Sequence, residues 1–161
     1  MLKRLRHLPS TVWLIGLVSL VNDGASELVL PLLPLYLSSV LMAGPKILGL
    51  MEGIAEATGS LVKLLSGVLR DRGGHSRPWI LAGYGLAALA RPLIALASSW
   101  PMVLVLRFSD RVGKGLRTAP RDALLANAVA EDERGLAFGL HRALDNAGAV
   151  IGPLEIGRAH V

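Results

Sequence analysis

The sequence predicts an all-α protein, a polytopic transmembrane helical bundle of about five helices. Hydrophobic residues make up 52% of its 161 residues, only 18% are charged, and the mean hydropathy is +0.52. Soluble domains contain about 25% charged residues, so this composition leaves too little polar surface to cover a soluble domain. Several apolar runs also approach the roughly 20 residues that a helix needs to cross a bilayer. A membrane protein is therefore the expected class.

The residue types exclude several functions. The absence of cysteine excludes disulfides, thiolate zinc sites, iron–sulfur clusters and cysteine nucleophiles. The four histidines lack metal-ligand spacing, and no serine lies in a Gly-x-Ser-x-Gly turn. The net charge is +5, but aromatic residues are only 4% and the charges are scattered through apolar runs, which disfavours nucleic acid. We expect no enzyme, no metal and no cofactor, and the lipid bilayer as a partner.

The first expected helix covers approximately residues 11–37. Basic residues precede it as in a secretory signal, but no small-residue cleavage site follows, so we interpret it as an uncleaved helix. Alternatively, this helix breaks near Gly24, and Asp23 caps its second half. The second and third expected helices cover approximately 47–69 and 78–97, and Gly-Pro and Gly-Gly pairs lie in the connections before them.

The fourth and fifth expected helices cover approximately 100–129 and 135–154. The fourth begins apolar and then fills with charge, and we expect Gly113, Gly115 and Pro120 to kink or interrupt it. Short connections throughout predict antiparallel neighbours.

Lysine and arginine are distributed unevenly among the connections. Basic residues precede the first helix and lie between the second and third, whereas the alternate connections carry Lys46 alone. By the positive-inside rule, this distribution predicts a chain in the inner (plasma) membrane with a cytoplasmic N-terminus.

Charged side chains inside the expected helices are candidates for a functional site, because each costs about 2.5–3.5 kcal/mol at membrane depth unless it faces the interior. Asp23 and Glu27 lie one turn apart, and two carboxylates held in a low-dielectric site could exchange protons near neutrality. Glu52, Glu56 and Lys63 fall within about 40° of one another on the second helix. They form either a polar packing seam or a substrate or proton site.

The fourth helix carries a stripe of charge. If it is continuous, an arc of about 140° contains Arg107, Asp110, Arg111, Lys114, Arg117, Arg121 and Asp122. A surface amphipathic helix has the same pattern, but Arg107 and Asp110 lie early, within a clearly apolar run. The cations indicate either an anionic or polar substrate or, as we favour, internal pairing with carboxylates at positions 23, 52 and 56. Arg91 of the third helix is expected to form an internal ion pair.

Three motifs follow one another along the expected helices. The first is Gly67-Val68-Leu69-Arg70-Asp71-Arg72-Gly73-Gly74, the second is Arg107 followed by Gly113 and Gly115, and the third is Gly148-Ala149-Val150-Ile151-Gly152-Pro153. The first resembles the Gly-x-x-x-Asp-Arg-x-Gly signature of the major facilitator superfamily, although His75-Ser76 replace its two following basic residues. The other two are similar to that family's fourth-helix arginine motif and its fifth-helix Gly-x-x-x-Gly-Pro motif.

This resemblance covers residues 1 to about 154 and implies a secondary transporter built from two six-helix halves. It implies a conformational role for Gly67, Asp71, Arg72 and Gly74, and a shaping role in the fifth helix for Gly148, Gly152 and Pro153. Arg107 becomes a candidate for proton coupling. The full set of substrate or proton-coupling candidates is Asp23, Glu27, Glu52, Glu56, Arg107, Asp110, Arg111, Arg117 and Arg121.

The length does not suffice for such a transporter, because about five helices cannot complete even one half. We therefore expect an N-terminal fragment. The tail at 155–161 turns polar abruptly and resembles a translated sequencing adapter; the alternative is a genuine polar C-terminus.

The expected function is secondary active transport of an unknown small solute by alternating access, coupled to protons. The alternative is a membrane scaffold or sensor that does not transport and oligomerises through its small-residue stripes.

Overall fold

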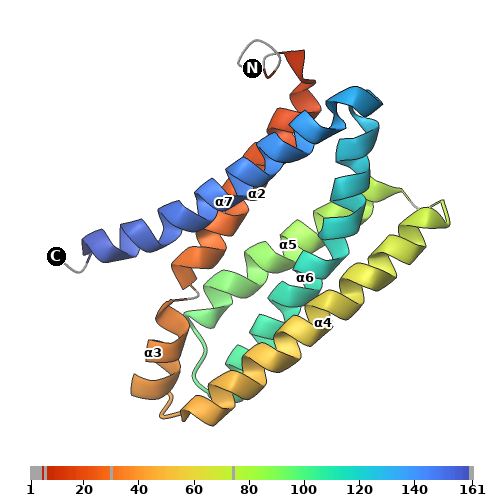
Figure 1. The fold of residues 1–161 in the computed structure, drawn as a ribbon. Coiled ribbons are helices and arrows are strands. Elements are labelled where there is room, and N and C mark those ends of the chain that lie inside the picture. The colour runs from red at the N-terminus through yellow and green to blue at the C-terminus, as the bar shows by residue number, and fades with distance from the viewer. Residues whose placement is uncertain (1–4, 6, 30, 74, 160–161) are drawn as a thin grey trace. The chain divides into compact units, whose positions relative to one another are not determined.

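The computed structural model describes residues 5, 7–29, 31–73 and 75–159, with side chains described through residue 151. The regular structure of these residues is entirely helical, which confirms the predicted all-α class. In chain order the elements are α2 (Ser10–Val29), α3 (Leu32–Ser39), α4 (Pro45–Asp71), α5 (Ser76–Ile94), α6 (Trp100–Asn127), the 3-10 turn η1 (Glu131–Glu133) and α7 (Arg134–Ala159) (Figure 1).

The chain divides into two compact units. The terminal unit contains Met1–Pro31 and Asp122–Val161, and the central unit contains Leu32–Arg121. Each unit is described by itself below, and the candidate site lies within the central unit.

The predicted first helix is wrong in one respect, because the stretch 11–37 forms two helices. α2 ends at Val29 and α3 begins at Leu32. Pro31 lies between them, and a proline lacks the N–H group that an uninterrupted helix needs at that position. The alternative break near Gly24 is wrong as well, since Gly24 lies inside α2.

The remaining expected helices correspond to α4, α5, α6 and α7. α4 begins with Pro45 in its first turn, where a proline is well tolerated. At its other end Gly73 has a φ of 93°, a backbone conformation that favours glycine. The backbone of α7 remains helical to Ala159, past residue 155 where we expected a polar tail to begin.

In the terminal unit, α2 packs along α7. The buried core at one end of this pair comprises Leu8, Val12, Leu125 and Ala137. Further along, the two backbones come very close: a side chain built on Gly148 would collide with the carbonyl oxygen of Leu20, and one built on Gly24 would lie 3.4 Å from the carbonyl oxygen of Gly148. Glycine permits this approach because it has no Cβ.

In the central unit, glycines allow α6 to pack closely against α4 and α5. A Cβ on Gly113 would lie 2.6 Å from the carbonyl oxygen of Gly83 in α5, and a Cβ on Gly115 would lie 2.8 Å from that of Gly59 in α4. The expected interruption is therefore wrong: α6 continues through both glycines and through Pro120. The two glycines serve close packing instead.

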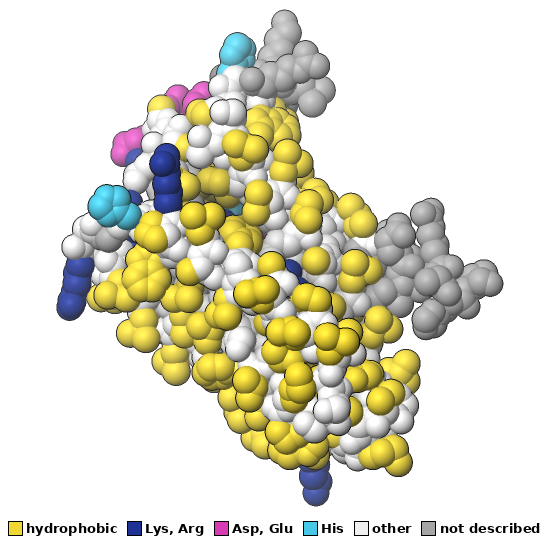
Figure 2. Space-filling view, turned by 180° about the vertical axis from the view of Figure 1, so that it is seen from behind, with side chains coloured by type: hydrophobic (Ala, Val, Ile, Leu, Met, Phe, Trp, Pro, Cys, Tyr) yellow, Lys and Arg dark blue, Asp and Glu magenta, His cyan; other side chains and the backbone are white. Residues whose placement is uncertain are grey.

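Large apolar side chains lie outside the packed interior. Among the described residues, Ser10–Ser39 is the one stretch that is long and apolar enough to cross a membrane by length and composition alone. The other long helices contain charged residues, yet many of their leucines are exposed, including Leu64, Leu81 and Leu89. Hydrophobic side chains cover most of the face shown in Figure 2.

Candidate functional site

Most of the charged stripe of α6 faces the interior of the central unit, whereas Lys114 is exposed and Asp122 belongs to the terminal unit. Arg107 and Asp110 are each 3% exposed and Arg117 is 2% exposed, whereas Val105 and Phe108 on the opposite side are 62% and 41% exposed. A surface amphipathic helix would have the reverse arrangement, with its charges in water. The interpretation of α6 as a surface helix is therefore wrong.

Arg107 of α6 makes a bidentate pair with Glu52 of α4. Its Nε donates to Oε1 of Glu52 at 2.9 Å, and its Nη2 donates to Oε2 at 3.0 Å. Two parallel charge-assisted hydrogen bonds are the strongest arrangement that an arginine and a carboxylate can make. The expected internal pairing of the fourth-helix cations with Glu52 is confirmed by these contacts.

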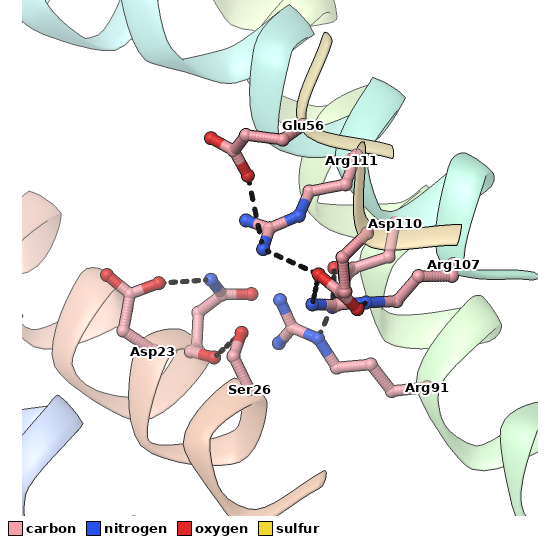
Figure 3. A network of polar contacts seen from close by, with 9 residues as sticks. Asp23, Ser26, Glu56, Arg91, Arg107, Asp110 and Arg111 are labelled. Atoms are coloured by element: carbon pink, nitrogen blue, oxygen red, sulfur yellow. Dashed lines mark hydrogen bonds and ion pairs between the residues drawn. The ribbon is translucent and has the colours of Figure 1, made fainter. Parts of the chain in front are cut away.

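Asp110 joins two guanidinium groups. Arg91 of α5 donates from Nε to Oδ1 of Asp110 at 2.9 Å, and Arg107 contacts Oδ2 from Nη1 at 3.5 Å (Figure 3). The expected ion pair of Arg91 is thereby confirmed, with a partner that the sequence alone did not identify. Since Asp110 is buried, this carboxylate links α5 to α6 in a region of low dielectric constant.

Arg111 extends the network toward its exposed edge. Its Nη2 lies 3.8 Å from Oε2 of Glu52 and 3.3 Å from Oε2 of Glu56. Its Nε is buried and has no hydrogen-bond partner within the described part of the chain. The expected pairing with Glu56 is confirmed here, and Arg111 keeps hydrogen-bonding capacity that the two glutamates do not use.

Together these residues form a cluster, which we call the arginine cluster: Glu52, Glu56, Arg91, Arg107, Asp110 and Arg111. Three positive and three negative side chains make it formally neutral. The cluster has a buried part and an accessible part: the three arginine side chains are 4–14% exposed and that of Asp110 is 5% exposed, whereas those of Glu52 and Glu56 are 35% and 67% exposed. The buried part of the cluster therefore contains three arginines and one aspartate, and its accessible edge contains two glutamates.

Arg117 and Arg121 continue the inward face of α6. The Arg117 guanidinium lies 4.6 Å from the centroid of the Tyr84 ring, a cation–π contact with α5. Arg121 is buried as well. Sequence reasoning missed Tyr84 and also Gly83 beside it. The small residues Gly83, Ala87 and Ala90, spaced at helical intervals, are the signal that could have identified this buried face.

Asp23 and Glu27 lie on α2 in the terminal unit, and both are half-buried. Asn22 donates from Nδ2 to Oδ1 of Asp23 at 3.2 Å, and Ser26 donates to the backbone carbonyl of Asn22 at 3.1 Å (Figure 3). Within the described residues Glu27 has no ion-pair partner. Proton exchange at these two carboxylates stays a prediction.

The first motif lies at the end of α4. Gly67 faces the Cβ of Ala119 in α6, at 3.7 Å from its own ideal Cβ position. Asp71 and Arg72 are exposed, and the backbone turns at Gly73 immediately after them. Gly74 lies outside the described residues. The conformational role that the resemblance implies for this motif stays a prediction.

The third motif lies on α7. Gly148 is buried in the close approach to α2 described above. Gly152 and Pro153 belong to the helical backbone of α7, but their surroundings lie outside the described side chains. A shaping role for Gly148 is consistent with this geometry.

No metal centre is formed within the described part of the chain, because no three His, Cys, Asp or Glu side chains are grouped to hold an ion.

Known proteins resemble this chain along most of its length. The model of the Major Facilitator Superfamily matches residues 15–157. The chain is 34% identical over 147 residues to an uncharacterized MFS-type transporter of Methanocaldococcus jannaschii, covering 91% of the chain and 36% of that protein. It is 33% identical over 127 residues to a multidrug resistance protein of Photorhabdus laumondii, covering 78% of the chain and 31% of that protein.

A further relative, an uncharacterized protein of Mycobacterium tuberculosis, is 36% identical over 140 residues, covering 87% of the chain and 33% of that protein. The chain thus spans about a third of the length of the curated relatives it matches. The family match covers well over half of the chain and includes the arginine cluster. The resemblance found in the three motifs is confirmed, and the chain belongs to the major facilitator superfamily, a family of multi-pass membrane transport proteins.

Proposed function

We propose that residues 1–161 supply helices to a secondary active transporter that moves a small solute by alternating access and couples this movement to protons. The observation that carries the proposal is the buried arginine cluster in a chain of a transporter family. Charged side chains at membrane depth are costly and usually mark the pathway of a substrate or an ion. The proposal places the cluster on that pathway.

The cluster has the properties of a switch. Its pairs are buried on the arginine side, but Glu52 remains accessible on the carboxylate side. A proton or a solute that binds Glu52 therefore weakens the pair that neutralises Arg107. Alternating access requires such a difference in interaction energy between two arrangements of the helices.

Individual residues receive roles within this proposal. Arg107 and Asp110 hold the centre of the switch, Glu52 and Glu56 form its accessible edge, and Arg111 connects the two. Arg117 and Arg121 extend the polar pathway along α6, while Asp23 and Glu27 form a second candidate proton site on α2. Gly67, Asp71, Arg72 and Gly74 control the change of conformation.

The membrane orientation is part of the proposal. We place the N-terminus and the α4–α5 connection on the cytoplasmic side of the plasma membrane, because basic residues concentrate there. A relative is named as a multidrug resistance protein, which supports a small organic molecule as the solute.

Transport is tested with the full-length protein that contains this chain, reconstituted in vesicles that enclose a pH-sensitive dye. Succinate, ethidium and glucose are added in turn as an anionic, a cationic and a neutral solute. We expect at least one of them to drive proton movement, and Arg107→Lys to reduce the rate at least tenfold. Glu131→Gln is the matched control, because it removes a carboxylate from an exposed pair with Arg134.

Two results contradict the proposal. Equal rates in the wild type and in Arg107→Lys remove Arg107 from the mechanism. A protein that is stable and unaffected by any of the solutes or by the pH gradient fits the membrane scaffold instead.

A further inference from the structure

We propose that the arginine cluster is a binding site for a small carboxylate, and that Glu52 occupies this site as an internal substitute while no solute is bound. The inference rests on the proposed transport function and names the chemical class of the solute. It follows from exposure, hydrogen-bond geometry and charge balance in the central unit.

The exposure of the charged groups decides which of them belongs to the permanent site. The Arg107 side chain is 4% exposed and that of Asp110 is 5% exposed, so both are fixed parts of the interior. The Glu52 side chain is 35% exposed although it accepts the strongest contacts in the cluster. The Glu52 carboxylate is therefore the component of this pair that the rest of the chain leaves accessible.

The contacts of Glu52 are those that a carboxylate ligand would make. Both of its oxygens bind one edge of the Arg107 guanidinium, at 2.9 and 3.0 Å. Arg111 provides a third contact at 3.8 Å and has a buried Nε without a hydrogen-bond partner among the described residues. A planar carboxylate that arrives from solution can take over the same bidentate position.

Glu52 has room to leave. In a helix a side chain leans toward the turn before it, so Glu52 leans toward residue 49. Gly49 and Gly53 are both exposed, and a Cβ on either would have no neighbour within 4 Å. The Glu52 side chain can therefore turn away from Arg107 without displacing another helix.

The charge balance selects an anion. With Glu52 turned away, the site keeps three arginines against Asp110 and Glu56, so its net charge is 3 − 2 = +1. A carboxylate ligand restores neutrality, whereas a cation would leave a larger uncompensated charge in the interior. A cation could contact only the edge at Glu56, where the side chain is 67% exposed and pairing is weak.

Chemical rescue tests this inference on the full-length protein in detergent, without a membrane gradient. Glu52→Ala vacates the proposed site, and acetate is the probe. We expect acetate to raise the thermal unfolding midpoint of Glu52→Ala in a saturable manner by about 3 °C over chloride at equal ionic strength. The effect should be at least twofold smaller in the wild type, because Glu52 competes for Arg107.

Two controls accompany the measurement. Glu131→Ala vacates a carboxylate beside the exposed Arg134 and should show no difference between acetate and chloride. The double variant Glu52→Ala/Arg107→Lys should lose the acetate effect, since lysine cannot form the bidentate pair. If Glu52→Ala does not fold, the same comparison is made with Glu52→Ser, which also vacates the position of the carboxylate and keeps a polar side chain.

Equal midpoints in acetate and chloride for the vacated variant overturn the inference. Such a result together with proton movement driven by ethidium or glucose leaves the proposed transport function intact. Conversely, saturable rescue by acetate without movement of any solute in vesicles supports the anion site and contradicts the transport function.

Discussion

Asp110 is the residue on which the central unit's buried charges depend most directly. Its two carboxylate oxygens contact different guanidiniums, from Arg91 at 2.9 Å and from Arg107 at 3.5 Å. Removing one member of a buried pair leaves a charge that is neither hydrated nor neutralised. The main effect of removing the Asp110 charge is therefore that it leaves buried arginine charges without neutralisation; the loss of its hydrogen bonds is the smaller effect.

We predict that Asp110→Asn lowers the free energy of unfolding by about 3 kcal/mol, because two buried arginines would share one carboxylate fewer. Glu131→Gln, at an exposed pair of the same i,i+3 spacing, should change it by less than about 0.5 kcal/mol. Denaturant unfolding in detergent, followed by tryptophan fluorescence, measures both. A loss for Asp110→Asn as small as that of the control would show that water already hydrates this site.

At the scale of helices, glycines determine how closely α6 packs against its neighbours, because they have no side chain. Gly83 in α5 and Gly113 in α6 face each other so closely that neither tolerates a methyl group without movement of the backbone. This contact lies close to the arginine cluster in sequence and holds α6 beside Arg91 of α5. Small residues thus determine how accurately the charged groups meet.

Gly83→Ala should destabilise the protein by about 1–3 kcal/mol, because its Cβ would lie 2.5 Å from the Gly113 carbonyl oxygen and 2.9 Å from the Cβ of Arg117. The matched control is Gly85→Ala in the same helix, where a Cβ meets nothing within 4 Å. That variant should be neutral or more stable by up to about 1 kcal/mol, because alanine favours helix. Thermal unfolding of both variants checks the prediction, which fails if they shift equally.

At the scale of the whole molecule, the distribution of polarity is that of a membrane protein. Leucines such as Leu81 and Leu89 lie on the outside, while Arg107, Asp110 and Arg117 lie inside. Lipid or the further helices of the family's fold can cover the outer leucines. The protein contains no cysteine, so single cysteines can report on exposure without background.

We predict that a cysteine at His75, in the α4–α5 connection, reacts with a membrane-impermeant maleimide only from the cytoplasmic side. A cysteine at Gly44, before α4, should react only from the opposite side, and one at Leu81 should react from neither side until the protein is denatured. Labelling in right-side-out and inverted vesicles measures all three. Reaction of His75→Cys in right-side-out vesicles would reverse the proposed orientation.

The sequence predicted the helical class, and the inward stripe of α6 could be read from its spacing. Composition and periodicity suffice for both predictions, because in a membrane helix the apolar side faces lipid and the charged side must then face the protein interior. Several local expectations were wrong. The glycines at 113 and 115 were expected to interrupt α6, because a glycine lowers helix propensity regardless of what packs on it. Whether a glycine within a helix marks an interruption or a close helix–helix contact depends on the neighbouring helix.

The partners within the arginine cluster were only partly predictable. Pairing with Glu52 and Glu56 could be expected because these side chains share one face of α4. The contact between Arg91 and Asp110 joins two helices whose relative register no single sequence specifies. Likewise, the residues directly on either side of Pro31 are apolar, so hydropathy gives no sign of the break there.

The order of the cluster's members along the chain has a consequence for synthesis at the ribosome. The charges of α6 come after their partners, since Glu52 belongs to α4 and Arg91 to α5. Arg107 and Asp110 would each oppose insertion of an isolated helix by about 2.5–3.5 kcal/mol. Because earlier segments are made first, neutralising partners are already in place when α6 reaches the translocon.

Insertion of α6 should therefore depend on residues in helices that precede it. In the whole chain, Glu52→Gln combined with Arg91→Gln should at least halve the fraction of molecules with α6 inserted. An acceptor site in a lengthened α6–α7 connection measures this, because it escapes lumenal glycosylation when α6 is inserted and is glycosylated when it is not. Lys63→Gln, at an exposed position of α4 outside the arginine cluster, should leave this fraction unchanged. If all variants insert equally, α6 enters the membrane without help, and the cluster assembles only afterwards. If the double variant inserts less efficiently, the charges that form the candidate binding site are also required for insertion of α6 into the membrane.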